Sequence, residues 1–169
     1  MQTVLKHLEG EPVGIAHLRR SVPAHVRVVE FDKMPTSIDQ LFGKKKAVIV
    51  LYDMHSSEGA TAGGAGHYIV LIKRPKGLEY FSSYGLAPPV EVAATHSNPK
   101  KFSFLPRKLI VNRTKFQSKR HTATCGRWAF CRALLADLDL KHFQKYFSGK
   151  VRVQTPDDLV SIATIFAIH

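Results

Sequence analysis

The sequence GHYIVLIKRPKGLEYFSS, residues 66–83, contains the clearest structural signal in the chain. Its apolar, β-branched run from His67 to Lys73 is typical of a buried strand. The tripeptide Pro75-Lys76-Gly77 is a turn sequence, and Leu78 to Phe81 returns as a second apolar strand. This pattern predicts an antiparallel β-hairpin.

Strand and helix signals also occur on both sides of this hairpin. The apolar run at 47–52 indicates a strand buried on both faces, and Thr155 followed by Pro156 is a strong helix start. Residues 87–106, rich in Pro, Ser and Asn, are expected to form a surface loop, and the Gly-rich residues 55–66 a mobile one. Further strands are predicted at 25–31 and 108–112, helices at 34–42, 125–138, 141–147 and 155–168, and loop with short helix at 1–25, to which we assign no role.

Length and charge set the class of the protein. The 169 residues, 44% of them apolar, suit one α+β domain spanning 1–169. Lys and Arg exceed Asp and Glu by 25 to 13, a net charge of +12 that predicts an acidic partner such as nucleic acid. The longest apolar runs are strand-sized, so we expect no membrane span, and the first twenty residues lack the features of a secretory signal.

The two cysteines, Cys125 and Cys131, lie six residues apart within one predicted helix. They are not on one helix ridge, so a disulfide between them is not expected. The absence of a C-x-x-C pair and the scattered histidines argue against a metal site. Cys131 is expected to be a small buried apolar residue, while the pattern of Trp128 and Leu134 with charges at Arg127, Arg132 and Asp137 predicts an amphipathic helix.

Three residues have placements that suit acyl-transfer chemistry. Cys125 begins a predicted helix, where unpaired N–H groups and the helix dipole favour a thiolate nucleophile. His67 opens a strand and is suited to act as its base, and Gln117 is suited to hold the negative oxygen of a tetrahedral intermediate. The alternatives are a buried free thiol, a strand-end histidine and a solvated loop amide.

Four short motifs occur in order: GHYIVLI at 66–72, LEYFSSYG at 78–85, FQ at 116–117 and TCGRW at 124–128. Together they resemble the adenain-like cysteine proteases, the maturation proteases of adenoviruses, related large DNA viruses, virophages and Maverick-type elements, which are more distantly related to the SUMO-deconjugating proteases. The resemblance covers residues 47–138. It implies a papain-like fold, in which a small mixed sheet packs against helices and the nucleophile stands at a helix N-terminus. It also implies Cys125 as nucleophile, His67 as general base and Gln117 as oxyanion donor.

The sequence departs from the resembling enzymes at Ser82, where they have an Asp or Glu that orients the histidine. A serine can accept a hydrogen bond from imidazole but supplies no negative charge. Three interpretations follow: a Cys–His dyad with Ser82 as a weak orienter, which we favour, an acid such as Asp53 or Glu58 from the Gly-rich region, or a non-catalytic relative. Glu79 is a poor substitute because strand alternation points it to the opposite face.

Residues 100–132 hold ten Lys or Arg, including Arg127 and Arg132, and no Asp or Glu. Such a segment is either a solvated charged surface or a binding site for the phosphate backbone of nucleic acid. The resemblance implies the latter, because adenoviral proteases use viral DNA as a cofactor. The predicted DNA-binding residues are Lys100, Lys101, Arg107, Lys108, Arg113, Lys115, Lys119 and Arg120.

The resemblance implies a viral cysteine endopeptidase that cleaves capsid or scaffold precursors during virion maturation through a thioester. It implies no cofactor for the chemistry itself, with viral DNA and an activating peptide as accessory factors. We expect a monomer, located in the virion and in the host nucleus or a cytoplasmic virus factory. The alternatives are a protease that deconjugates a ubiquitin-like modifier, which normally has a Trp near the histidine where this chain has Tyr68, and a non-catalytic basic DNA-binding protein.

Overall fold

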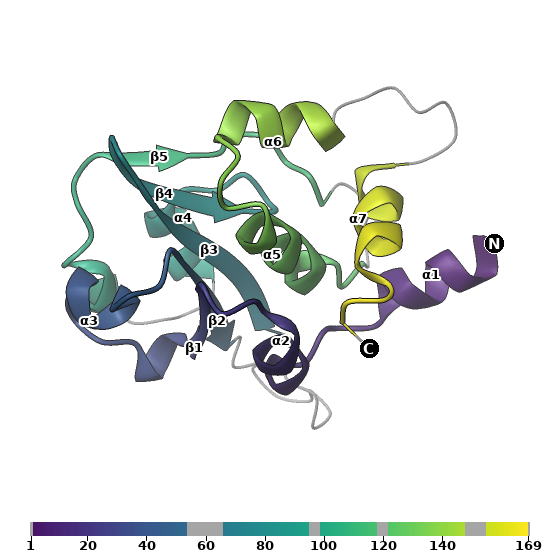
Figure 1. Cartoon of the computed structure of the whole chain (residues 1–169), viewed down its shortest axis with the longest axis horizontal. Coiled ribbons are helices and arrows are strands. Elements are labelled where there is room, and N and C mark those ends of the chain that lie inside the picture. The colour runs from purple at the N-terminus through teal and green to yellow at the C-terminus, as the bar shows by residue number, and fades with distance from the viewer. Residues whose placement is uncertain (1, 54–65, 95–98, 118–121, 148–154, 169) are drawn as a thin grey trace.

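A computed structural model describes residues 2–53, 66–94, 99–117, 122–147 and 155–168. Its centre is a five-stranded mixed sheet in the order β1-β2-β3-β4-β5 (Figure 1). The two outer pairs are parallel and the two inner pairs are antiparallel. The strands are β1 (Val26–Glu30), β2 (Ala47–Asp53), β3 (Gly66–Arg74), β4 (Gly77–Ser82) and β5 (Leu109–Val111). The predicted hairpin is confirmed as β3 and β4, and the predicted strands at 25–31, 47–52 and 108–112 are confirmed as β1, β2 and β5.

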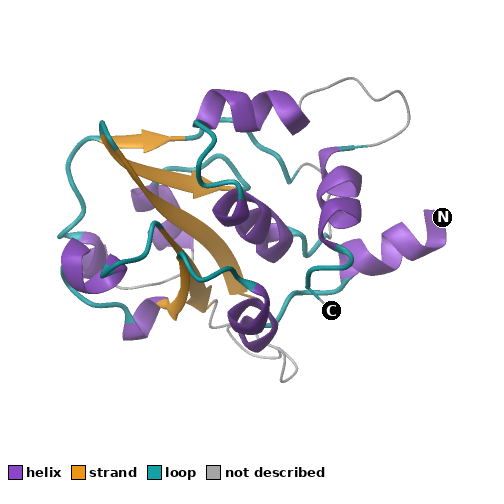
Figure 2. Ribbon diagram, in the orientation of Figure 1, coloured by secondary structure: helices purple, strands orange, loops and turns teal. Residues whose placement is uncertain are grey.

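Both faces of the sheet are covered, as Figure 2 shows. Alternate residues of β2 enter two separate cores, Ile49 on one face and Val50 on the other, which explains its unbroken apolar run. The first face packs against α5 (Cys125–Leu134), with α2 (Ile15–Ser21), α6 (Leu140–Phe147) and α7 (Pro156–Thr164) around it. The second packs against α3 (Ile38–Phe42), α4 (Pro88–Ala94) and the 3-10 helices η1 (Phe31–Lys33) and η2 (Pro99–Phe102). The chain is therefore an α+β protein with a mixed sheet between helical layers.

Helix α5 is the most deeply buried helix of the described part of the chain. Residues 125–133 are all buried, so the predicted amphipathic pattern is wrong for this helix, which also ends at Leu134. Arg132 is fully buried because its guanidinium binds both carboxylate oxygens of Glu79 on β4, at 2.7 and 3.0 Å. Arg127 is buried against α7, where it donates to the Thr164 hydroxyl at 3.2 Å. A buried carboxylate therefore balances the charge of Arg132, whereas Arg127 has a neutral hydroxyl partner and its Nε atom has no hydrogen-bond partner within the described residues.

One segment differs from the sequence-based expectation. Residues 87–106 are not a continuous loop, since they contain α4 and η2. The two prolines at the start of α4 are tolerated in a first helical turn, where the missing N–H groups have no intrahelical partner. The prediction of loop with short helix for the N-terminal segment is confirmed: residues 2–25 contain α1 (Gln2–Gly10) and α2, joined by loop, and α1 contacts α7.

The two helices predicted near the C-terminus are confirmed, but α7 ends at Thr164 and not at residue 168. Helix α7 begins with Thr155 as its cap, reciprocal hydrogen bonds between Thr155 and Asp158, and Pro156 in the first turn. Helix α6 matches the predicted 141–147. In the described residues, no helix has the length and apolar character needed to cross a bilayer.

Candidate active site

Cys125 is the first residue of α5, directly after Thr124. The Thr124 hydroxyl and the Trp128 indole N–H both donate to Oδ1 of Asp157 on α7, at 2.6 and 3.1 Å. These bonds hold the beginning of α5 in place, and Asp157 is a residue that sequence reasoning missed. The Cys125 thiol lies 3.7 Å from the carbonyl oxygen of Gly66, at the start of β3.

His67 is the second residue of β3 and lies opposite Tyr52 in the sheet. Its Nε2 atom lies 3.2 Å from the Ser82 hydroxyl and 3.1 Å from Oε2 of Glu91, and its ring stacks on Tyr84 with centroids 4.4 Å apart. Burial disfavours the charged imidazolium, but the interactions with Cys125 and Glu91 outweigh burial and raise the pKa of His67 to about 9. His67 is thus electrostatically coupled to both the thiol and a buried carboxylate.

The other ring nitrogen of His67, Nδ1, is buried and has no aligned hydrogen-bond partner within the described residues. With Nε2 engaged by Ser82 and Glu91, Nδ1 is the nitrogen left to exchange a proton with Cys125. The thiol is near enough to raise the pKa of His67 without being aligned with Nδ1 as a hydrogen-bond donor. Catalytic hydrogen bonds are often long or poorly aligned before substrate binds.

The carboxylate beside His67 is Glu91 of α4, a residue that sequence reasoning missed. It comes from the segment predicted to be a surface loop, and it is only 2% exposed. The candidate acids Asp53 and Glu58 stay untested, because Glu58 and the side chain of Asp53 lie outside the described residues. One signal was available, since Glu91 is the only acidic residue between Glu79 and Asp137 and stands in an otherwise apolar stretch, APPVEVAA.

Glu79 and Ser82 of β4 point to opposite faces of the sheet, as strand alternation predicted. Glu79 points to the α5 face, where it pairs with Arg132 and also with Arg74 at 2.7 Å. Ser82 points to the other face, where its hydroxyl contacts His67 and donates to Glu91. Glu79 is therefore a structural ion-pair partner, and Ser82 is the β4 residue at the candidate site.

Gln117 is buried at the same site, in the segment before α5. Its backbone N–H donates to the Ser83 carbonyl at 3.0 Å, and its side-chain oxygen accepts from the Ser83 hydroxyl at 3.1 Å. Its Nε2 atom donates to the carbonyl of Thr122 at 2.7 Å, which assigns the amide orientation because a carbonyl can only accept. Gln117 also lies close to Tyr84, the residue that stacks on His67. Burial raises the pKa of Tyr84 to about 12. The charge of Cys125 raises this pKa further, and a hydrogen bond with Gln117 lowers it.

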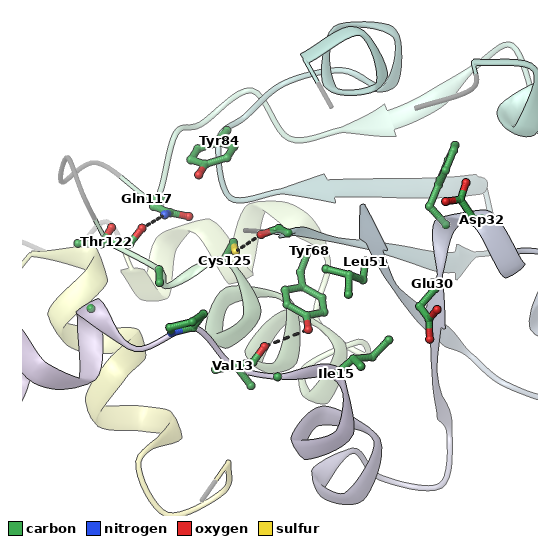
Figure 3. A pocket seen from close by; sticks show the side chains of 16 residues that line it. Val13, Ile15, Glu30, Asp32, Leu51, Tyr68, Tyr84, Gln117, Thr122 and Cys125 are labelled. Atoms are coloured by element: carbon green, nitrogen blue, oxygen red, sulfur yellow. Dashed lines mark hydrogen bonds between the residues drawn. The ribbon is translucent and has the colours of Figure 1, made fainter. Parts of the chain in front are cut away.

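A cavity of about 760 Å³ opens above the thiol. In Figure 3, Gln117, Thr122 and Tyr84 lie at one end of this cavity, Cys125 and Tyr68 near its middle, and Glu30 and Asp32 at the far end. Residues 10–15 form one wall, where the Tyr68 hydroxyl donates to the Val13 carbonyl at 2.9 Å. The N-terminal segment, to which the sequence assigned no role, thus lines the candidate site.

The predicted DNA-binding residues fall into three groups. Five are exposed, on η2, around β5 and in the segment before Gln117: Lys100, Arg107, Lys108, Arg113 and Lys115. Lys101 is half-buried, with its ammonium donating to the carbonyls of Phe31 and Asp32. Lys119 and Arg120 lie outside the described residues. Arg127 and Arg132, which add to the positive charge of the sequence segment, are buried and do not contribute to a surface.

Both cysteines are free thiols. Burial raises the pKa of Cys131 to about 12, with the charge of Arg132 opposing, so its thiol stays protonated at neutral pH. The described residues include no group of three or more His, Cys, Asp or Glu side chains that could hold a metal ion.

No family model matches the chain. The chain is 30% identical to "Uncharacterized protein V9" of Sputnik virophage, with 76% of this chain and 79% of that protein aligned. The chain therefore belongs to the family of this virophage protein and is a virus-associated protein.

Proposed function

We propose that the protein is a cysteine endopeptidase in which Cys125 is the nucleophile and His67 the general base. The observation that supports this most directly is the convergence of three separate segments on one cavity. Cys125 and Gln117 line the cavity, and the interactions of His67 with Cys125 and Glu91 raise its pKa despite burial. Perturbed titratable groups beside a cavity are a general mark of catalytic sites.

In the proposed reaction, His67 holds the proton of Cys125 and the thiolate attacks the carbonyl carbon of a peptide bond. The new C–S bond forms while the carbonyl electrons move to oxygen, where Gln117 and backbone N–H groups at the start of α5 stabilise the charge. The tetrahedral intermediate collapses, the C–N bond breaks, and His67 gives its proton to the leaving amine. Water, deprotonated by His67, then attacks the thioester to release the acid and restore the thiol.

We further propose that the substrates are capsid or scaffold precursors processed during virion maturation. Kinship with a virophage protein supports a viral setting. An elongated cavity with the thiol near its middle suits an extended peptide that runs past the nucleophile on both sides. This arrangement favours an endopeptidase over an enzyme that acts on a small molecule.

Covalent labelling tests the proposal. The purified protein is treated with a peptidyl-glycine electrophile between pH 5 and 9, and the modified residue is mapped by mass spectrometry. We expect rapid labelling of Cys125 and none of Cys131, with the rate falling sharply in His67→Ala and unchanged in the surface control His142→Ala. Slow labelling that is equal in wild type and His67→Ala would refute the proposal and favour a non-catalytic relative.

The exposed basic residues support a second role, binding of duplex DNA through the phosphate backbone. Lys108 and Arg113 flank β5, and Lys115 follows in the same segment toward Gln117. DNA bound along this segment would therefore lie near the site that contains Gln117. The labelling experiment is repeated with and without DNA. A change in the labelling rate would show that DNA is an accessory factor for the thiol, whereas binding with no change in rate would show that DNA is a ligand that does not affect the thiol.

A further inference from the structure

Glu91, His67 and Ser82 each contact the other two. One carboxylate oxygen lies 3.1 Å from His67 Nε2, and the other accepts the hydrogen bond of the Ser82 hydroxyl. Ser82 Oγ is itself 3.2 Å from the same Nε2 atom. The side chains of His67 and Glu91 are only 3% and 2% exposed, so solvent screens this interaction little.

Backbone interactions hold this arrangement in place. Ser82 is clamped by Asn112, which accepts from the Ser82 N–H and donates to its carbonyl, both at 2.8 Å. The chain then turns at Gly85, whose φ of 71° suits glycine and whose Cα packs so closely that a Cβ would lie 2.9 Å from the backbone of Thr114. This turn leads into α4 and directs Glu91 back toward the end of β4.

The hydrogen-bond directions determine where the proton of His67 lies. A carboxylate can only accept, and the Ser82 hydroxyl already donates to Glu91. Both partners of Nε2 are therefore acceptors, so Nε2 carries hydrogen in the neutral as well as the charged ring. The neutral ring then has its lone pair on Nδ1, the nitrogen left for Cys125, which is the tautomer that a base requires.

We propose that Glu91 is the positioning carboxylate of this site: it supplies from α4 the negative charge that the resembling enzymes have at the position of Ser82, and Ser82 links it to His67. This inference rests on the proposed function for its catalytic meaning. Under this inference the site is a charged triad of Cys125, His67 and Glu91, and not a Cys–His dyad assisted only by Ser82. The acid lies nine residues after the position at which the resembling enzymes have theirs. An Asp added at position 82 beside Glu91 would bring two carboxylates together, and one of them would take up a proton.

Titration of His67 tests the inference without any need for catalysis. In a Cys125→Ala background, the imidazole signals are followed by NMR against pH, and the His67 signal is assigned from its loss in His67→Gln. We expect Glu91→Gln to lower the pKa of His67 by about one to three units, the usual effect of losing an opposite charge at this distance. The control is Glu79→Gln, which neutralises an equally buried carboxylate on the opposite face of β4 and should leave this pKa unchanged. An unchanged His67 pKa in folded Glu91→Gln would overturn the inference.

Transfer of the charge provides the second test, in protein with Cys125 intact. Ser82→Asp/Glu91→Ala removes the Glu91 carboxylate and places one where the resembling enzymes have theirs. We expect Glu91→Gln and Glu91→Ala to slow labelling of Cys125 at least tenfold, and the double variant to recover most of the rate and the raised His67 pKa. A double variant that folds but recovers neither the labelling rate nor the raised His67 pKa would contradict the inference. This test remains decisive even if Glu91→Gln does not fold. If the wild type is never labelled, the proposed function fails, while the titration still decides the role of Glu91.

Discussion

Replacement of Gln117 by alanine separates stabilisation of an oxyanion from activation of the thiol. One N–H of the Gln117 amide is committed to the carbonyl of Thr122, and the amide nitrogen has a second N–H, for which Tyr84 and a substrate oxygen would compete. In the proposed reaction, this second donor binds the oxygen that becomes negative when the thiolate attacks a carbonyl. The side chain is 3% exposed, so the hydrogen bond would form away from bulk water, where it is strongest.

The expected size of the effect follows from that single donor. Loss of one oxyanion donor typically costs about 2.7 to 4 kcal/mol in the transition state, which corresponds to a roughly 100- to 1,000-fold lower rate. The substitution also leaves the Ser83 hydroxyl without its present acceptor, at a cost of about 1 to 3 kcal/mol in stability. The catalytic effect is therefore measured well below the unfolding temperature of the variant.

Two reactions of the same thiol make the assay specific. Peptide cleavage passes through a tetrahedral oxyanion, whereas alkylation by iodoacetamide displaces iodide from a saturated carbon and forms no oxyanion at a carbonyl. We expect Gln117→Ala to lower peptide cleavage by the factor above and to change alkylation of Cys125 less than threefold. The matched control is Gln144→Ala on α6, where the amide donates to the Thr114 hydroxyl on the protein surface. Equal losses in both reactions, or a loss in neither, would refute the role of Gln117 as oxyanion donor.

Three further predictions concern charges. Arg132→Met should destabilise the fold by about 3 to 5 kcal/mol in urea unfolding, because it leaves Glu79 buried without its main partner. A loss below about 1 kcal/mol would show that Arg74 alone is enough to balance the buried Glu79 charge. The pKa of His67 in the folded protein lies above 6.5, so protonation of His67 should stabilise the fold fully below pH 6.5, and this stabilisation should disappear as the pH rises through about 9. The measurement is the difference in unfolding free energy between wild type and His67→Gln at each pH. A difference that grows as the pH rises would contradict the prediction. Affinity for duplex DNA should fall steeply with salt, and Arg113→Ala and Lys115→Ala should each reduce the slope of log K against log salt by about 1; a flat salt dependence would argue against phosphate contacts.

Most of the sheet could be predicted because its signals are local. The apolar run of β2 and the hairpin of β3 and β4 each contain their own information: alternation, β-branched residues and a Pro-Lys-Gly turn. The start of α7 was equally readable from Thr155 and Pro156, since a helix cap is made by residues a few positions apart. Helix α4 was missed because its two prolines and small residues have the composition of a loop.

Charge burial could not be predicted in the same way. Arg127 and Arg132 belong to a basic stretch that suggested solvent exposure, yet both are buried in the core, where Arg127 contacts Thr164 and Arg132 pairs with Glu79. These partners are separated from them by 37 and 53 positions. Whether a charged residue is buried depends on what the fold places beside it.

The sequence by itself predicted Cys125, His67 and Gln117 as candidate site residues, because a helix start, a strand start and short motifs of fixed order mark them. Only the tertiary structure brought Glu91 to His67, through the turn at Gly85 and a helix that returns the chain to the end of β4. The same holds for Asp157 at the start of α5 and for the N-terminal wall of the cavity. A nucleophile and its base depend on local backbone geometry, whereas the acid that orients the base needs only to supply a charge at the right point in space. Any element that passes that point can provide it, so its place in the sequence is free to change.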